Sequence, residues 1–264
     1  MRTPNYHRAE PLGGVVSRLE DRLLAAVKAT GVKPKDSDLQ ALKKNWNQRL
    51  SDNLANAVAA ELRDRGMKSV LPAEPGQVGL SGAERRLSGG IGAKKVDVSW
   101  ATEESGLIFA VSVKTIMWRD GASGNYQKNL TNRRGDMLIE SVTLHRRFPY
   151  AVLAAFLFLD VGAESDDVSV EGKAKRRKST FANAFPRLRL FTGRNDPAGR
   201  EEQFEKFYIF LLDSNPFKPS IRAYEVNDRE TGVDIDKALD EMIELVGERN
   251  FDLYDGTDGF ITKI

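Results

Sequence analysis

Asp97 and Lys114 lie in two neighbouring segments whose pattern predicts a β-hairpin. The first segment, residues 95–100, alternates apolar and polar side chains, with Val96, Val98 and Trp100 on one face. The second, residues 107–114, alternates in the same way, with Leu107, Phe109, Val111 and Val113 on one face. Residues 102–106 are polar and end in glycine, as hairpin turns do. If Val98 faces Val111, Asp97 faces Ser112 and has Lys114 as its diagonal neighbour.

A carboxylate beside an ammonium at the end of a hydrophobic hairpin suits metal-assisted hydrolysis of a phosphodiester. A divalent metal neutralises phosphate charge and lowers the pKa of an attacking water. Mg²⁺ prefers carboxylate oxygens and keeps several waters, so one or two acids suffice. A nearby lysine orients or deprotonates the water and stabilises developing negative charge. We therefore predict a Mg²⁺ site with Asp97 as a ligand and Lys114 as the general base or water-orienting group.

The motif of Asp97 followed, after the hairpin, by Ser112-Val113-Lys114 resembles the PD-(D/E)xK nuclease superfamily, the fold of many type II restriction endonucleases. Val96 stands where that motif often has proline, and Ser112 stands where it has a second acid. Serine at that position is similar to restriction enzymes that read CCGG-containing sites, in which the missing carboxylate comes from the following helix. At the spacing usual in that group this chain has Lys128. The resemblance covers about residues 61–160 and implies that Ser112 is a polar neighbour of the metal site.

Several acids are candidates for the second carboxylate. Glu140 and Asp136 lie on a predicted helix, residues 129–148, that follows the hairpin. Glu61, near the end of an earlier predicted helix, fits a position where the resembled superfamily often carries an acid, and Glu84 is a further candidate. The alternative interpretation of each is an ordinary solvated glutamate or aspartate paired with neighbouring arginines.

The remaining pattern predicts an α/β fold in which a restriction-endonuclease-like core, a mixed sheet flanked by helices, carries an N-terminal helical region. Helices are predicted at residues 15–30, 37–65 and 234–248, with a capping box at Ser37 and Gln40. Residues 150–159 are apolar throughout and predict a strand buried on both faces; strands are also predicted at 207–212 and 221–226. Residues 72–93 are rich in glycine and predict mainly loop or an irregular hairpin. We divide the chain into residues 1–66, helical, and 67–264, the core, with a basic insertion around 161–200.

Composition excludes several other chemistries. The 264 residues are 41% hydrophobic and 30% charged, as in soluble globular proteins, and include no cysteine, which removes disulfides and thiolate chemistry. With only His7 and His145, nucleases built on histidine metal ligands are disfavoured, and neither a nucleophile elbow nor a phosphate-binding loop is present. No apolar run is long enough to span a bilayer and no signal-peptide core begins the chain, so we expect a cytoplasmic protein without a membrane partner.

The distribution of charge favours a nucleic-acid partner, although the net charge is only +2. Residues 171–200 hold nine bases against two acids, interleaved with Phe181, Phe185 and Phe191, a composition that suits a duplex backbone. The alternative is a basic loop without a partner. The candidate DNA-binding residues are Arg119, Lys128, Arg133, Arg134, Lys175, Arg176 and Arg177. The acidic segment from residue 227 onward is expected to face away from DNA.

We expect a Mg²⁺-dependent, site-specific endonuclease of double-stranded DNA, acting as a homodimer because cutting both strands usually needs two active sites. One alternative is a structure- or damage-directed repair nuclease. Another is a catalytically inactive module of the same fold that binds DNA or a protein partner, which the replacement of an acid by Ser112 favours.

Overall fold

The computed structural model describes residues 18–74, 85–88, 90, 92–167 and 178–264. Its centre is a five-stranded mixed sheet in the order β3-β4-β5-β6-β7. The strands are β3 (Val98–Thr102), β4 (Gly106–Ile116), β5 (Val152–Asp160), β6 (Lys206–Asp213) and β7 (Ser220–Glu225). β4, β5 and β6 run parallel to one another, and β3 and β7 add to the two edges in the antiparallel sense. The mixed α/β class expected from the sequence is confirmed.

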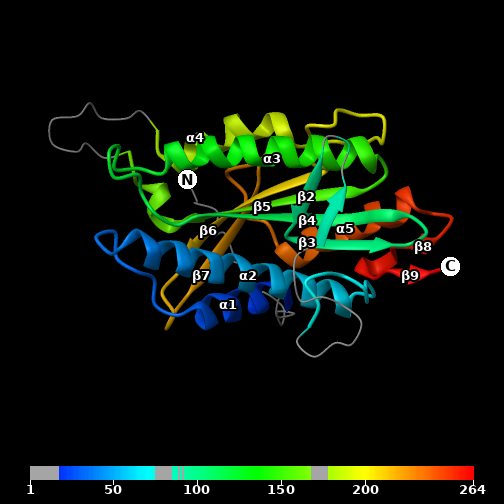
Figure 1. Cartoon of the computed structure of the whole chain (residues 1–264), viewed down its shortest axis with the longest axis horizontal. Helices are drawn as coiled ribbons and strands as arrows, with labels where there is room; N and C mark the ends of the chain where they lie inside the picture. The colour runs from blue at the N-terminus through cyan, green and yellow to red at the C-terminus, as the bar shows by residue number, and fades with distance from the viewer. Residues whose placement is uncertain (1–17, 75–84, 89, 91, 168–177) are drawn as a thin grey trace, which may run out of the picture.

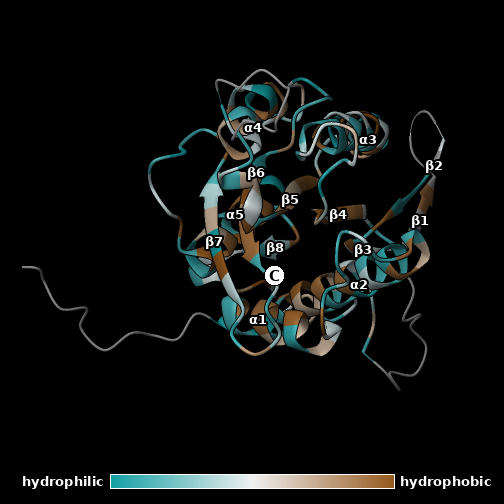
Figure 2. Cartoon of the chain, turned by 90° about the vertical axis from the view of Figure 1, so that its left-hand side faces the viewer, coloured by the Kyte–Doolittle hydropathy of each residue, from teal (hydrophilic) through white to brown (hydrophobic). Residues whose placement is uncertain are grey.

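Helices cover both faces of this sheet (Figure 1). α1 (Arg18–Thr30), α2 (Gln40–Asp64) and α5 (Ile235–Arg249) pack in one hydrophobic core, and α3 (Gln127–Arg147) and α4 (Thr180–Leu188) pack in a second one on the opposite face. β5 supplies both cores, with Phe156 and Phe158 in the first and Leu157 and Leu159 in the second. The strand predicted to be buried on both faces is thus confirmed. Figure 2 shows hydrophobic residues gathered along the strands between the helical layers.

The N-terminal helices form because apolar side chains recur on one face. In α2, Trp46, Leu50, Leu54 and Val58 follow at four-residue spacing, and all are buried. The helix ends before Gly66, which has φ 101°, a value that favours glycine. α2 begins at Gln40 behind Leu39, which makes no side-chain cap, so the predicted capping box at Ser37 is wrong. The helices of residues 1–66 share their core with the sheet and pack directly on it.

Two further hairpins lie outside the main sheet. β1 (Arg85–Ser88), which lies in the segment predicted as loop or irregular hairpin, pairs in the antiparallel sense with β2 (Ala93–Val96). This hairpin lies along α3, where the Gly90 amide donates to the Thr143 carbonyl at 2.8 Å. β8 (Tyr254–Asp255) pairs with β9 (Thr262–Lys263) near the C-terminus. Short 3₁₀ turns occur at η1 (Val161–Glu164), η2 (Arg189–Phe191) and η3 (Thr257–Gly259).

The register of the predicted hairpin is confirmed, because Val98 lies opposite Val111. A bulge between Trp100 and Ala101 changes the alternation beyond that point. Leu107 therefore belongs to the α3–α4 core, and Ile108 to the α1–α2–α5 core. The prediction that Leu107 shares a face with Phe109 is wrong for this reason.

The basic insertion contains structure that its composition did not predict. Residues 180–188 form α4, and Phe181, Phe185 and Phe191 are buried in the core against the sheet. The three rings that interleave with the bases in the sequence are therefore part of the hydrophobic core. Arg194, one of the nine bases, is also buried and pairs with Glu205 at 2.9 Å. Within the part of the chain that the structure describes, no helix is long and apolar enough to cross a membrane.

Candidate active site

The site is built where the first hairpin strand stops short. The β3–β4 ladder ends at the pair of Val98 and Val111, and β4 continues to Ile116. Asp97 lies at the break between β2 and β3, so Val96 enters the α3–α4 core while Val98 enters the other one. The predicted common face of Val96 and Val98 is therefore wrong. The Asp97 carboxylate accepts a hydrogen bond from the Val113 amide at 2.7 Å, in place of a strand partner.

Three charged side chains meet at this edge of β4. Lys114 Nζ lies 2.6 Å from Asp97 Oδ2 and 3.3 Å from Glu140 Oε2. Ser112 and Lys114 are two residues apart and therefore share one face of β4, the face that α3 covers. Glu140 comes from α3. The Glu140 side chain is 2% exposed, whereas Lys114 and Asp97 are 14% and 21% exposed. We call Asp97, Lys114 and Glu140 the charged trio.

Two more polar groups border the charged trio. Ser112 is buried, and its hydroxyl lies beside Glu140, where it favours the charged form of that carboxyl group. Lys94 of β2 places its Nζ 4.0 Å from Glu140 Oε2. The sequence analysis missed Lys94, although its position two residues before Val96 predicts that both side chains share a face of the strand.

Burial and charge act on the trio in opposite directions. Burial raises the pKa of Glu140, as does the nearby Asp97 carboxylate, while the Lys114 ammonium acts against both. Burial alone lowers the pKa of Lys114, but the attraction of Glu140 and Asp97 outweighs it and raises that pKa above its ordinary value. Lys114 is therefore an ammonium ion at neutral pH in this arrangement.

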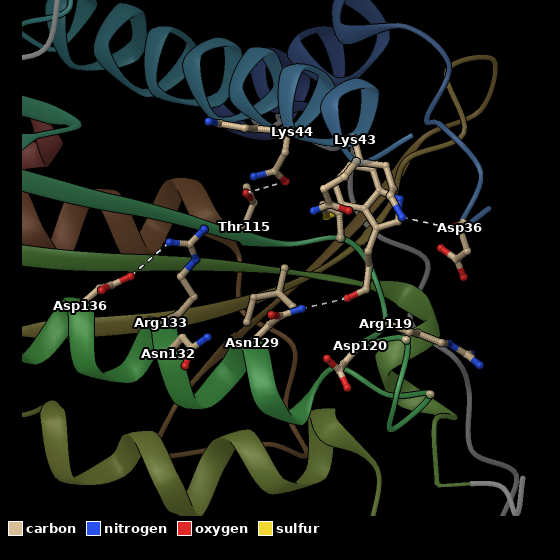
Figure 3. Close-up of a pocket in the computed structure, with 17 residues that line it drawn as sticks. Asp36, Lys43, Lys44, Thr115, Arg119, Asp120, Asn129, Asn132, Arg133 and Asp136 are labelled. Atoms are coloured by element: carbon tan, nitrogen blue, oxygen red, sulfur yellow. Dashed lines mark hydrogen bonds and ion pairs between the residues drawn. The ribbon is translucent and has the colours of Figure 1, made fainter. Parts of the chain in front are cut away.

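A polar cleft of about 970 Å³ adjoins the charged trio between α2 and α3 (Figure 3). Thr115, next to Lys114, lines it, and so does Asp136, which lies one helical turn before Glu140. Its walls carry cations, amides and three acids, Asp36, Asp120 and Asp136. The lining cations and amides are Lys43, Lys44, Arg119, Arg133, Gln40, Asn47, Asn129 and Asn132.

Some of the cleft cations are paired with neighbouring groups. Figure 3 shows Arg133 extending from α3 towards the strand that carries Thr115, with its guanidinium 3.1 Å from Asp136. Lys43 donates to the Asp36 carbonyl at 2.9 Å. Arg119 is exposed, with its guanidinium carbon 5.8 Å from the Tyr126 ring centroid. A polar stripe at positions 40, 43, 44 and 47 of the long predicted helix was the sequence signal for the α2 wall.

The structure brings together Asp97, Lys114, Ser112 and Glu140 among the predicted catalytic residues. Asp136 lies on the cleft wall, paired with Arg133. Glu61 lies elsewhere: its buried carboxylate is 2.9 Å from both Arg22 and Arg65. Glu84 lies outside the described residues.

The predicted DNA-binding residues divide in the same way. Arg119 and Arg133 line the cleft. Lys128 is exposed and pairs with Asp120 at 3.1 Å. Arg134 turns away from the cleft, with its guanidinium carbon 5.5 Å from the Phe191 ring centroid. Lys175, Arg176 and Arg177 lie outside the residues that the structure describes.

The acids at this site match the ligands that a magnesium ion takes. In the described ranges no three His, Asp or Glu side chains group so as to hold a metal. Two carboxylates, Asp97 and Glu140, converge on one ammonium, and the Ser112 hydroxyl lies beside Glu140. This oxygen-only set of two acids fits Mg²⁺, which keeps several waters and needs one or two carboxylates.

Comparisons of the chain with protein-family models, with curated proteins and with solved structures found no match.

Proposed function

We propose that this chain is a Mg²⁺-dependent endonuclease of double-stranded DNA with a restriction-endonuclease-like core. The observation that carries the proposal is the convergence of Asp97 and Glu140 on Lys114, beside a cleft lined by cations and amides. A strand end and a helix each supply one acid, and one or two carboxylates are enough to bind Mg²⁺. The order of hairpin, helix and parallel buried strand supports the fold assignment.

Asp97 and Glu140 are the residues that would hold the metal ion. When bound, Mg²⁺ supplies charge neutralisation at the phosphate and a more acidic water. The Val113 amide holds Asp97 Oδ2 at 2.7 Å, so the carboxylate is oriented before any ligand arrives. α3 fixes Glu140 from the other side, with its side chain almost fully buried.

Lys114 acts through its charge in this proposal. Because Asp97 and Glu140 raise its pKa, it is protonated at neutral pH and does not serve as a base in this arrangement. Its ammonium can orient the attacking water or donate to a phosphate oxygen as negative charge develops. Of the two roles expected from the sequence, orientation of the water is the one that fits the contacts of the metal-free site.

The cleft is the proposed DNA-binding surface. Lys44, Arg119 and Arg133 can contact phosphates, and the asparagine and glutamine amides can donate to or accept from base edges. Cutting both strands calls for two copies of the site, so we propose a homodimer as the active form.

A second function, a DNA-binding module without catalysis, is favoured by one specific observation. Asp97 and Glu140 are already neutralised by Lys114, and Lys94 lies close to Glu140. An ion-paired cluster of this kind can also be purely structural. The two functions share the cleft and differ only in whether the trio accepts a metal ion.

Plasmid cleavage in Mg²⁺ separates these functions. We expect the wild-type protein to nick or linearise supercoiled DNA, and Asp97→Asn, Lys114→Ala and Glu140→Gln to lose this activity. Glu248→Gln, which changes an exposed acid on α5, is the control and is expected to keep cutting. Discrete fragments support a site-specific enzyme, and activity confined to branched or damaged DNA supports a repair nuclease. DNA binding without cleavage by the wild type supports the inactive module. No binding and no cleavage overturns both functions.

A further inference from the structure

Lys94 is a second lysine beside the charged trio, supplied by a separate element. It lies on β2, where it shares a strand face with the buried Val96 and so faces α3. Its neighbour Lys95 lies on the opposite face and is exposed. The Lys94 side chain is 29% exposed, so its ammonium is reachable from solvent.

Glu140 does not account for the position of Lys94. Lys114 already lies 3.3 Å from Glu140 Oε2, whereas Lys94 lies 4.0 Å from the same atom, at the limit of an ion pair. Among described residues this is the one charged contact recorded for Lys94. A lysine ammonium on a flexible four-carbon stem can move from such a distant partner to a nearby anion.

The charge balance of the site also calls for a second cation. Two carboxylates face two ammonium ions, and a divalent metal on the carboxylates would leave both ammonium charges for the substrate. A phosphodiester carries one negative charge, and the pentacovalent transition state of its hydrolysis carries two. Lys114 alone matches the ground state, and Lys94 supplies the charge that matches the transition state.

We propose that Lys94 is a catalytic residue that contacts a non-bridging oxygen of the scissile phosphate. This inference rests on the proposed nuclease function and adds a residue to its site. In this proposal the β1–β2 hairpin places a phosphate-binding lysine at the edge of β4.

The first test measures DNA binding without cleavage. A labelled DNA duplex is titrated with wild type, Lys94→Ala, Lys94→Arg and the control Lys95→Ala in Ca²⁺, after a gel confirms that the duplex stays intact. Each phosphate contact contributes about 0.9 to the slope of log affinity against log salt. We expect Lys94→Ala to reduce the magnitude of that slope by about 0.9. Lys94→Arg and Lys95→Ala should keep the wild-type slope.

The second test measures single-turnover cleavage in Mg²⁺. Loss of one group that stabilises transition-state charge lowers the rate by about 100-fold. We expect that loss for Lys94→Ala, a largely retained rate for Lys94→Arg, and an unchanged rate for Lys95→Ala. The thermal midpoint of Lys94→Ala is expected to match that of Lys95→Ala.

The outcomes separate this inference from the function on which it rests. If the wild type cleaves and Lys94→Ala equals Lys95→Ala in slope and rate, the role of Lys94 is overturned and the nuclease stands. If Lys94→Ala loses activity and thermal stability but keeps the salt slope, Lys94 only supports Glu140, and the proposal is also overturned. If the wild type neither binds nor cleaves DNA, the nuclease and the role of Lys94 both fail.

Discussion

Replacing Lys114 by methionine is the sharpest test of how the charged trio is held together. The substitution keeps a similar side-chain length and removes the ammonium that lies 2.6 Å from Asp97 and 3.3 Å from Glu140. The two carboxylates then face each other without a cation between them. We expect the free energy of unfolding to fall, because Glu140 is buried and has lost its closest counter-charge.

The contacts set the size of this loss. At an effective dielectric constant of about 20, unit charges about 4 Å apart attract by about 4 kcal/mol, and desolvation offsets much of that. Removing one partner of a buried pair costs about 3–5 kcal/mol. Because Asp97 is 21% exposed and water screens it, we expect the lower end of that range, about 3 kcal/mol, at neutral pH.

The loss should depend on pH with a defined sign. Without Lys114, the pKa of Glu140 rises further above its ordinary value of 4.5, because burial and Asp97 now act unopposed by that ammonium. The folded variant then binds a proton more tightly than the unfolded chain does. Its stability falls as pH rises through the folded pKa and recovers as pH falls towards 4.5.

Urea unfolding followed by circular dichroism, at about pH 5 and about pH 8, measures this difference. Lys95→Met, at an exposed position of β2, is the control. The double variant Lys114→Met/Glu140→Gln should recover part of the lost stability, because it also removes the buried carboxylate charge that has no counter-ion. Equal stability of Lys114→Met and wild type at both pH values would refute the ion-pairing argument.

Three further results are expected. Glu205→Gln should lower the free energy of unfolding by about 3 kcal/mol, because Glu205 is buried between His145, Arg194 and Arg249. Burial alone raises the pKa of Glu205, but its partners hold that pKa below the ordinary value. The free energy of unfolding of the wild type should therefore fall as pH falls through that pKa, and the variant should not show this fall. Gly66→Ala should cost about 1–3 kcal/mol in urea unfolding, because φ is 101° and an added Cβ would meet the Ile261 carbonyl. Lys44→Ala in the cleft should weaken duplex binding and lower its salt slope by about 0.9, with Lys28→Ala as the distant control.

Each of these three expectations has a contradicting result. Glu205→Gln with wild-type acid sensitivity would show that Glu205 does not hold its network as a charge. A Gly66→Ala protein as stable as wild type would show that the turn after α2 can rearrange. Equal effects of Lys44→Ala and Lys28→Ala would remove the cleft from the binding surface.

The hairpin at the centre of the site could be predicted because local rules determine it. Alternation and a short polar turn were enough to place Val98 opposite Val111. The same rules could not locate the bulge after Trp100, because a one-residue change of register leaves little trace in composition. Helix α4 escaped prediction because its short apolar stripe follows a long run of bases.

The choice among acids needed tertiary information. Glu140 and Asp136 lie on the same face of α3, and only the placement of the helix along the sheet brings Glu140 to Lys114. The sequence itself indicates that Glu61 is not a ligand at this site, because its spacing from Val58 and Leu62 places it on the buried face of α2. A buried acid on such a face requires its own cations, and Arg22 and Arg65 provide them.

The unequal lengths of the two hairpin strands have a consequence for how this protein can diversify. β3 has five residues and β4 has eleven, so the surplus of β4 carries the reactive side chains while the segment after it forms part of the cleft wall. Insertions or exchanges in residues 117–126 would reshape what enters the cleft and leave the anchored carboxylates where they are. Selection or engineering can therefore change the shape of the cleft without changing the charged trio.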